Sequence, residues 1–151
     1  MEQFAPEVEF MRDTTELFNE LKTDLDIENF IAANQSEFTK PLHKFLTKLL
    51  KERHLTCKEI AFAMNVDPSY IHHIFSGTKK PSRERLLAIA RVMDLNLDET
   101  QYLLRYGGYG ILYPRTPYDS VIIYAIENGL TFSEMNNYLK QLGELPIVAE
   151  E

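Results

Sequence analysis

The sequence contains little cysteine, glycine or proline and no tryptophan. One cysteine, six glycines and seven prolines are spread over 151 residues. A single cysteine excludes a disulfide within the chain and is typical of a protein in a reducing compartment. Glycine and proline are the residues that most often interrupt regular structure, so their scarcity favours a mainly helical chain.

Long apolar runs are also missing, although 44% of the residues are hydrophobic. No segment approaches the ~20 apolar residues that a membrane-spanning helix needs. The first residues, Met-Glu-Gln-Phe-Ala-Pro-Glu, lack the basic start and apolar centre of a signal peptide. We therefore expect a soluble cytoplasmic protein with one globular core and no membrane partner.

Basic residues are outnumbered overall, but they are concentrated in the middle of the chain. The formal net charge is −7. Residues 37–91 hold eleven Lys and Arg against five Asp and Glu, whereas residues 1–36 hold two against nine and residues 92–151 three against nine. A basic centre between acidic flanks is typical of a nucleic-acid-binding module with appendages that do not bind. Chance segregation of charge is the alternative explanation.

Two short helices and a tight turn best explain the segment Leu55–Gly77. Thr56 can cap the first helix, whose apolar residues recur at helical spacing. The turn falls at residues 65–67. Pro68 fits the first position of the second helix, where no helical N–H is needed, and Gly77 can end that helix by taking a positive φ.

These two helices and their turn, here called the motif, are part of a longer ungapped pattern over residues 42–97. Its elements are Ala61, the turn Asn65-Val66-Asp67, Ile71, Ile74, Gly77, the loop Lys79-Lys80-Pro81-Ser82 and the apolar run Leu86-Leu87-Ala88-Ile89-Ala90. In register, they resemble the Cro/C1-repressor (Xre-type) helix-turn-helix DNA-binding domains. The resemblance implies an all-α fold with a five-helix lambda-repressor-like core and implies DNA binding.

Helical patterns on both sides of this core divide the chain into three parts. Residues 1–36 form an acidic N-terminal helical arm, and residues 37–106 form the helix-turn-helix DNA-binding domain. Residues 107–151 form a C-terminal helix pair that packs on the core or provides a dimer face. The first core helix is expected to begin near Thr39 or Lys40. The apolar stripes of the arm bury against the core of the domain, or the arm covers the basic DNA face when DNA is absent.

The resemblance places the second motif helix, residues 67–76, in the major groove of DNA. A helical projection puts apolar residues on one face of this helix and polar residues on the other. The candidates for base and nearby phosphate contacts are Ser69, Tyr70, His72, His73 and Ser76. Lysine and arginine neutralise phosphates, so the candidates for phosphate contacts are Lys40, Lys44, Lys79, Lys80, Arg83 and Arg85. The alternative is an exposed polar face that has no partner.

The sequence departs from the family pattern in three places. Cys57 stands where the family often has a glutamine that contacts DNA, and Phe75 stands where it often has a glutamate. The second motif helix contains no Arg, Lys, Asn or Gln. Those residue types are the bidentate readers of guanine and adenine, so sequence specificity is expected to be modest.

No catalytic or metal-binding pattern accompanies these features. The sequence shows no Ser/His/Asp set, no paired catalytic carboxylates and no nucleotide loop. His72 and His73 are adjacent, so on a helix they point ~100° apart and do not readily share one metal ion. We therefore predict a protein without enzymatic activity, cofactor or metal.

The predicted function is sequence-specific transcriptional regulation by binding to double-stranded DNA, with repression as the expected outcome. Many family members bind as dimers. Val121, Ile122 and Ile126 lie on an unusually apolar helix and either form a homodimer face or pack on the core. The alternative function is a protein-interaction adaptor or antitoxin-like module that keeps the fold, binds DNA weakly or not at all, and recruits a protein partner through the acidic arm.

Overall fold

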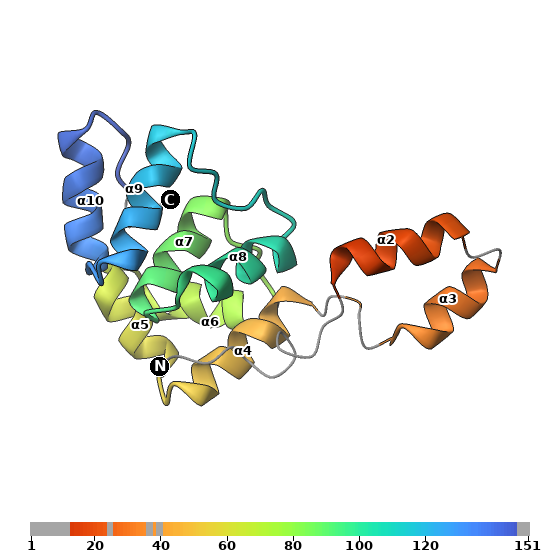
Figure 1. Ribbon diagram of the computed structural model, residues 1–151. Coiled ribbons are helices and arrows are strands. Elements are labelled where there is room, and N and C mark those ends of the chain that lie inside the picture. The colour runs from red at the N-terminus through yellow and green to blue at the C-terminus, as the bar shows by residue number, and fades with distance from the viewer. Residues whose placement is uncertain (1–12, 24–25, 36–37, 39–40, 148–151) are drawn as a thin grey trace. The chain divides into compact units, whose positions relative to one another are not determined.

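The structure is a computed structural model that describes residues 13–23, 26–35, 38 and 41–147 (Figure 1). The chain forms two compact units, Met1–Lys40 and Pro41–Glu151. All the regular structure in the described residues is helical, which confirms the predicted all-α fold. In this part of the chain, no helix is both long enough and apolar enough to cross a bilayer.

The N-terminal unit contains helices α2 (Thr14–Thr23) and α3 (Ile27–Ala33). An aspartate caps each helix, because the Asp13 carboxylate accepts from a backbone N–H of α2 and the Asp26 carboxylate accepts from two of α3. Phe30 is the one buried residue that α3 contributes, and its ring meets that of Phe38 edge-on, with centroids 6.5 Å apart. Four large apolar side chains remain exposed on these two helices: Phe18, Leu21, Ile27 and Ile31.

The C-terminal unit contains seven helices in its described residues 41–147. They are α4 (Leu42–Glu52), α5 (Cys57–Met64), α6 (Pro68–Ser76), α7 (Arg83–Val92), α8 (Leu97–Tyr106), α9 (Pro117–Glu127) and α10 (Phe132–Gln141). Helix α7 contacts α5, α8 and α10, and every residue of α7 from position 85 to position 91 is buried. This helix is therefore central to the core, because α5, α8 and α10 all pack on it.

Local side-chain signals explain where the motif helices begin and end. Thr56 and Glu59 form a reciprocal capping box at the start of α5. The Asp67 carboxylate accepts from the Ser69 N–H at 2.9 Å and so caps α6. Gly77 ends α6 with a φ of +87°, as its position in the sequence predicted.

The start of the first core helix differs from the prediction. Helix α4 begins at Leu42 rather than near Thr39 or Lys40, and Pro41 is its N-cap with a ψ of +142°. This ψ lies outside the helical region, so Pro41 is not part of the helix, and Thr39 and Lys40 lie outside the described residues.

A buried ion pair connects the end of α4 to the start of α8. The Arg53 guanidinium donates to both carboxylate oxygens of Glu99, at 2.8 and 3.0 Å, and to the Met93 carbonyl at 3.1 Å. The Glu99 carboxylate also accepts from the Asn96 N–H, so it caps α8 as well as pairing with arginine. Helices α4 and α8 therefore hold a fixed relative position.

The C-terminal pair packs on the rest of its unit. Helices α9 and α10 lie side by side in Figure 1, with α9 contacting α8 and α10 contacting α7. Val121 and Ile122 are buried within this unit, and Ile126 is half-buried. Of the three residues named as a dimer face, Ile126 is therefore the one that keeps appreciable surface for a second copy.

Candidate nucleic-acid interface

Helix α6 has one buried face and one exposed face. Ile71, Ile74 and Phe75 are buried, and the Phe75 carbonyl accepts a hydrogen bond from the Thr47 hydroxyl of α4 at 3.2 Å. The predicted base-contact residues lie on the other side of the helix. Ser69, His72, His73 and Ser76 are exposed, and Tyr70 is half-buried. The core thus holds the helix firmly and presents the polar residues to solvent.

The polar residues of α6 are not equally available. The Ser69 hydroxyl donates to the Asp67 carboxylate at 3.0 Å, and the Ser76 hydroxyl lies 3.2 Å from the His73 carbonyl. Both serine hydroxyls therefore already form hydrogen bonds within the protein, at the two ends of the helix. In the described part of the chain, the imidazoles of His72 and His73 have no hydrogen-bond or ion-pair partner, which leaves them available to bind base edges.

Two cationic side chains lie near the ring of Tyr70. The Lys79 ammonium is 5.6 Å from the centre of its ring, and the Arg85 guanidinium is 5.4 Å from it. Arg85 is only 8% exposed, so its guanidinium is largely shielded by its own unit. Of these two predicted phosphate contacts, Lys79 is the exposed one.

Lys80, like Lys79, lies close to a tyrosine ring. Its ammonium lies 4.9 Å from the centre of the Tyr109 ring, and the Tyr109 hydroxyl donates to the Pro81 carbonyl. Burial raises the pKa of Tyr109, and the nearby Glu84 raises it further, so the phenol remains neutral beside the lysine. Lys44, on α4, is exposed, whereas Lys40 lies outside the described residues.

Arg83, one of the predicted phosphate contacts, is hydrogen-bonded to groups of its own unit. Its guanidinium donates to both carboxylate oxygens of Asp119 on α9, at 3.1 and 2.9 Å. It also donates to the carbonyls of Gly110 and Ile111 in the segment that joins α8 to α9. Its hydrogen-bonding capacity is therefore used to fasten the C-terminal pair to α7.

Cys57 and Phe75 belong to the core rather than to the exposed surface. Cys57 is 8% exposed, and burial raises the pKa of its thiol, so it is a small apolar residue at the start of α5. Phe75 is 6% exposed. The positions at which the family often has polar residues are thus apolar packing positions in this chain.

One residue near α6 was missed by the sequence analysis. His43 is on α4, and its imidazole lies over Gly77, where a Cβ atom would be only 2.7 Å from the His43 Nδ1. His43 and Gly77 are distant in the sequence, and no local pattern connects them. The glycine could have been noted as a close-approach site, but its partner depends on how α4 packs against α6.

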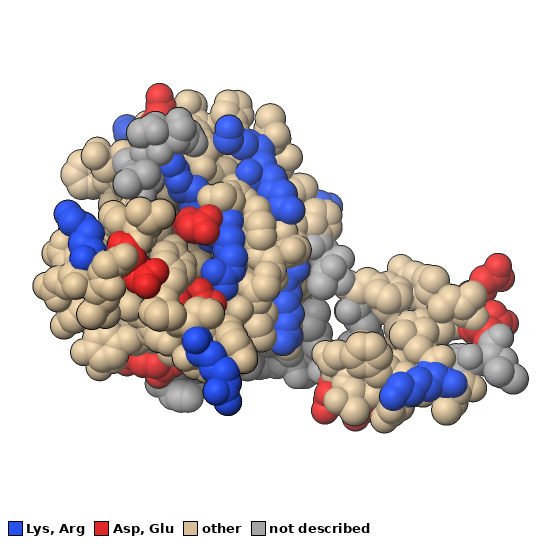
Figure 2. All heavy atoms as spheres, turned by 90° about the horizontal axis from the view of Figure 1, so that it is seen from above, with Lys and Arg blue, Asp and Glu red and all other residues tan. Residues whose placement is uncertain are grey.

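The basic side chains of the C-terminal unit are unevenly distributed. On the face of this unit seen in Figure 2, Lys and Arg side chains gather toward one side, and Asp and Glu side chains lie mostly toward the other. In the described residues, Lys44, Lys79 and Lys80 form no ion pair with a carboxylate. No carboxylate in the described residues therefore competes with a phosphate for these three lysines.

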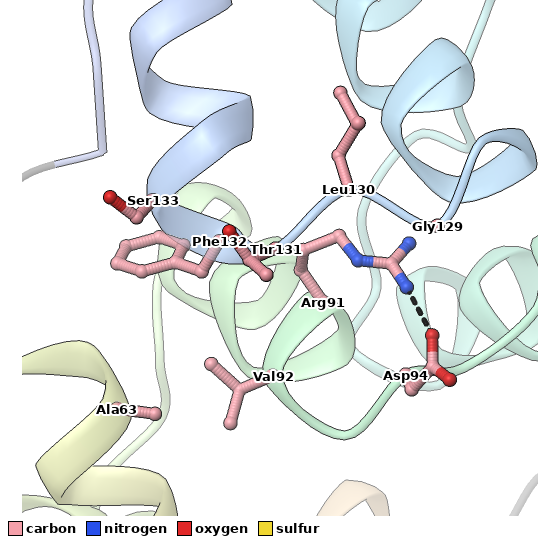
Figure 3. Close-up of a pocket in the computed structure, with 9 residues that line it drawn as sticks. All are labelled: Ala63, Arg91, Val92, Asp94, Gly129, Leu130, Thr131, Phe132 and Ser133. Carbon is pink, nitrogen blue, oxygen red and sulfur yellow. Dashed lines mark hydrogen bonds and ion pairs between the residues drawn. The ribbon is translucent and has the colours of Figure 1, made fainter.

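A pocket lies apart from the residues of this interface, where α5 and α7 end and α10 begins (Figure 3). Its volume is about 450 Å³, and its lining includes Arg91, which is 5% exposed and donates to the Asp94 carboxylate. The Arg91 Nε and Nη1 have no hydrogen-bond partner in the described part of the chain. Because Asp94 neutralises the arginine, this pocket has no uncompensated positive charge to attract a phosphate.

The comparison with protein families agrees with the motif. Residues 46–99 match the family described as Helix-turn-helix, a span that runs from within α4 to the start of α8. Neither a curated protein nor a solved structure matches the chain. Residues 46–99 thus form a helix-turn-helix domain. This match supports the resemblance to the Cro/C1-repressor (Xre) type found in the sequence.

Proposed function

We propose that the protein is a sequence-specific transcriptional regulator, acting as a repressor and without enzymatic activity. The observation that carries this proposal is the exposed polar face of α6, which lies beside lysines that have no carboxylate partner among the described residues. His72 and His73 are free to meet base edges, and Lys79 and Lys80 follow directly after the helix. Base contacts and phosphate contacts are the two components of a specific DNA interface.

Each part of this surface has a distinct task in the proposed complex. Helix α6 enters the major groove, where each imidazole of His72 and His73 can donate to or accept from a base edge. Tyr70, placed by its neighbouring cations, packs on a thymine methyl group or binds a phosphate. Lys44, Lys79 and Lys80 neutralise phosphates along the groove. Without Arg, Lys, Asn or Gln on α6, the preference for one operator over others is modest.

The proposed active form is a homodimer on a two-fold symmetric site. Two copies of α6 would then read half-sites about 34 Å apart, one turn of DNA. With Val121 and Ile122 buried, a contact through α9 would use Ile126 together with the exposed Tyr124. Sedimentation equilibrium tests this part separately, and a monomer at micromolar concentration would rule the dimer out.

A second candidate function is a protein-interaction adaptor or antitoxin-like module. It is favoured by the exposed apolar side chains of the N-terminal unit, among them Phe18 at 58% and Ile27 at 57% exposed. These residues lie in a strongly acidic segment, so the partner would be a protein with an apolar groove and a basic rim. In this function α6 would bind DNA weakly or not at all.

Fluorescence anisotropy on mixed-sequence duplex DNA, at several salt concentrations, separates the two functions. The regulator should bind at low salt, with an affinity that falls steeply as salt rises because several counterions are released. The adaptor should show no binding even at low salt. Absence of binding at about 50 mM salt would therefore contradict the regulator and leave the adaptor.

A further inference from the structure

A small polar pocket lies beside α6, where the start of α4, the loop after α6 and the end of α8 meet. Its volume is about 230 Å³, several times the ~30 Å³ that one water molecule occupies in the liquid. The residues that matter to its chemistry are His43, Gly77, Lys79, Lys80, Tyr106 and Gly107. The pocket is therefore formed by three segments that are far apart in the sequence.

The pocket has cationic groups on its lining and no acid. Lys79 and Lys80 both line it, and no aspartate or glutamate does. Neutral tyrosine rings, rather than carboxylates, accompany the two lysines, at 5.6 Å for Lys79 and 4.9 Å for Lys80. A ring orients an ammonium group without cancelling its charge. The positive charge of this pocket is thus held in place and left uncompensated.

His43 completes the lining with a nitrogen donor. Its ring lies so close to Gly77 that a Cβ atom there would be 2.7 Å from Nδ1 and 2.9 Å from the next ring carbons. Gly77 also has a φ of +87°, a conformation that other residues rarely adopt. The glycine is therefore required both for the end of α6 and for the approach of the imidazole.

We propose that this pocket binds one phosphate of the DNA backbone, with His43, Lys79 and Lys80 as its ligands. The inference rests on the proposed function, because it takes α6 to lie in the major groove. A helix in that groove brings the loop at its end against the phosphates that border the groove, and this loop supplies both lysines. The lysines act as charges, and the imidazole gives the directed hydrogen bond that fixes the register of the protein on the duplex.

The test compares DNA binding by four full-length proteins: the unchanged chain, His43→Phe, Lys80→Gln and the double variant. Phenylalanine keeps a ring over Gly77 but has no nitrogen donor. Each single substitution should weaken binding to mixed-sequence duplex about five- to tenfold. Because both groups hold the same phosphate, the double variant should lose less than the product of the two single losses. Lys140→Gln, on α10, is the matched control and should bind as the unchanged chain does.

The outcomes separate this inference from the proposed function. If the unchanged chain binds DNA but His43→Phe binds equally well, the pocket assignment fails and the regulator stands. If the unchanged chain does not bind DNA at low salt, both fail. A final measurement follows the His43 imidazole by NMR during titration with inorganic phosphate and, separately, with duplex DNA. A response to duplex supports the proposal, whereas a response to inorganic phosphate alone would make the site one for a free anion and overturn it.

Discussion

Arg83 and Asp119 form a bidentate ion pair that joins α7 to α9, with N–O distances of 3.1 and 2.9 Å. The aspartate is 6% exposed and also accepts from the Tyr113 N–H at 2.9 Å. Every oxygen and nitrogen in the pair therefore has a partner, which is the condition under which a buried ion pair is tolerated. The pair links the helix-turn-helix core to the C-terminal helices that follow it.

Arg83→Met should destabilise the protein without changing how DNA binding depends on salt. The substitution keeps the side-chain stem but leaves Asp119 as a buried charge without its partner, so the free energy of unfolding should fall by about 3 kcal/mol. Urea denaturation measures this loss. A phosphate contact would behave in the opposite way, with unchanged stability and a salt slope reduced by about one.

Lys79→Gln is the complementary variant. Lys79 is exposed and its partner is a neutral ring, so its substitution should change the free energy of unfolding by less than about 0.5 kcal/mol. The slope of log K against log salt should become shallower by about one, because one fewer counterion is released. Anisotropy titrations at four salt concentrations give this slope. An unchanged slope would remove Lys79 from the interface.

His72→Ala and His73→Ala should reduce specificity more than affinity. Each exposed imidazole is expected to make one hydrogen bond to a base edge, which contributes about 1 kcal/mol to discrimination. A preferred duplex would first be obtained by selection from random DNA. Both variants should then bind that duplex more weakly while binding mixed-sequence duplex as before. Equal weakening on both duplexes would indicate phosphate contacts instead.

The parts of this molecule that the sequence predicted are the parts that short-range chemistry determines. Thr56, Asp67 and Ser82 each cap a helix within three residues of themselves, so the caps are visible in the sequence alone. Apolar spacing likewise identified the inward face of α6, including Ile71 and Ile74.

Long-range partners explain what the sequence did not predict. In the sequence, Arg83 is indistinguishable from a surface cation. Its partner Asp119 is 36 positions further along the chain, on α9. The close approach of His43 to Gly77 depends on the packing of α4 against α6. In both cases the decisive contact is made only once the chain has folded.

Asp67 should make the start of α6 sensitive to acid. Hydrogen bonds from the backbone and the side chain of Ser69 lower the pKa of this carboxyl below its ordinary value of 3.8. A pKa that is lower in the folded state means that the stabilisation is complete above pH 3.8 and is lost as the pH falls through the lower folded value. Asp67→Ala should therefore lower the Tm at pH 7. The Tm difference between the two proteins should narrow below pH 3.8, and a constant difference down to pH 2 would contradict this.

Tyr118→Phe should stabilise the protein. Burial, with a smaller contribution from the nearby Glu84, raises the pKa of Tyr118 to about 12. The buried hydroxyl has no hydrogen-bond partner in the described part of the chain. Removing an unsatisfied buried hydroxyl should raise the free energy of unfolding by about 1 kcal/mol at pH 7. The folded-state pKa lies above the ordinary value of 10, so the unfolded chain loses the phenol proton first. The free energy of unfolding of the unchanged protein should therefore fall as the pH rises from 10 toward 12, and the advantage of the Tyr118→Phe variant should grow. Urea denaturation at pH 7 measures the gain, and a loss of stability would show that the hydroxyl has a partner in solution.

The acidic arm should reduce DNA binding, and the way it does so can be resolved. Residues 1–36 hold nine acidic residues against two basic ones, so a fragment of residues 41–151, which is one compact unit, should bind duplex DNA more tightly than the full chain. Simple charge repulsion should fade as salt shortens the Debye length to about 8 Å at 0.15 M. Direct covering of the basic surface by the apolar side chains of α2 and α3 should persist at that salt. The full-length double variant Phe18→Gln, Ile27→Gln keeps every charge, so tighter binding by this variant would show covering, and binding equal to that of the unchanged chain would show repulsion.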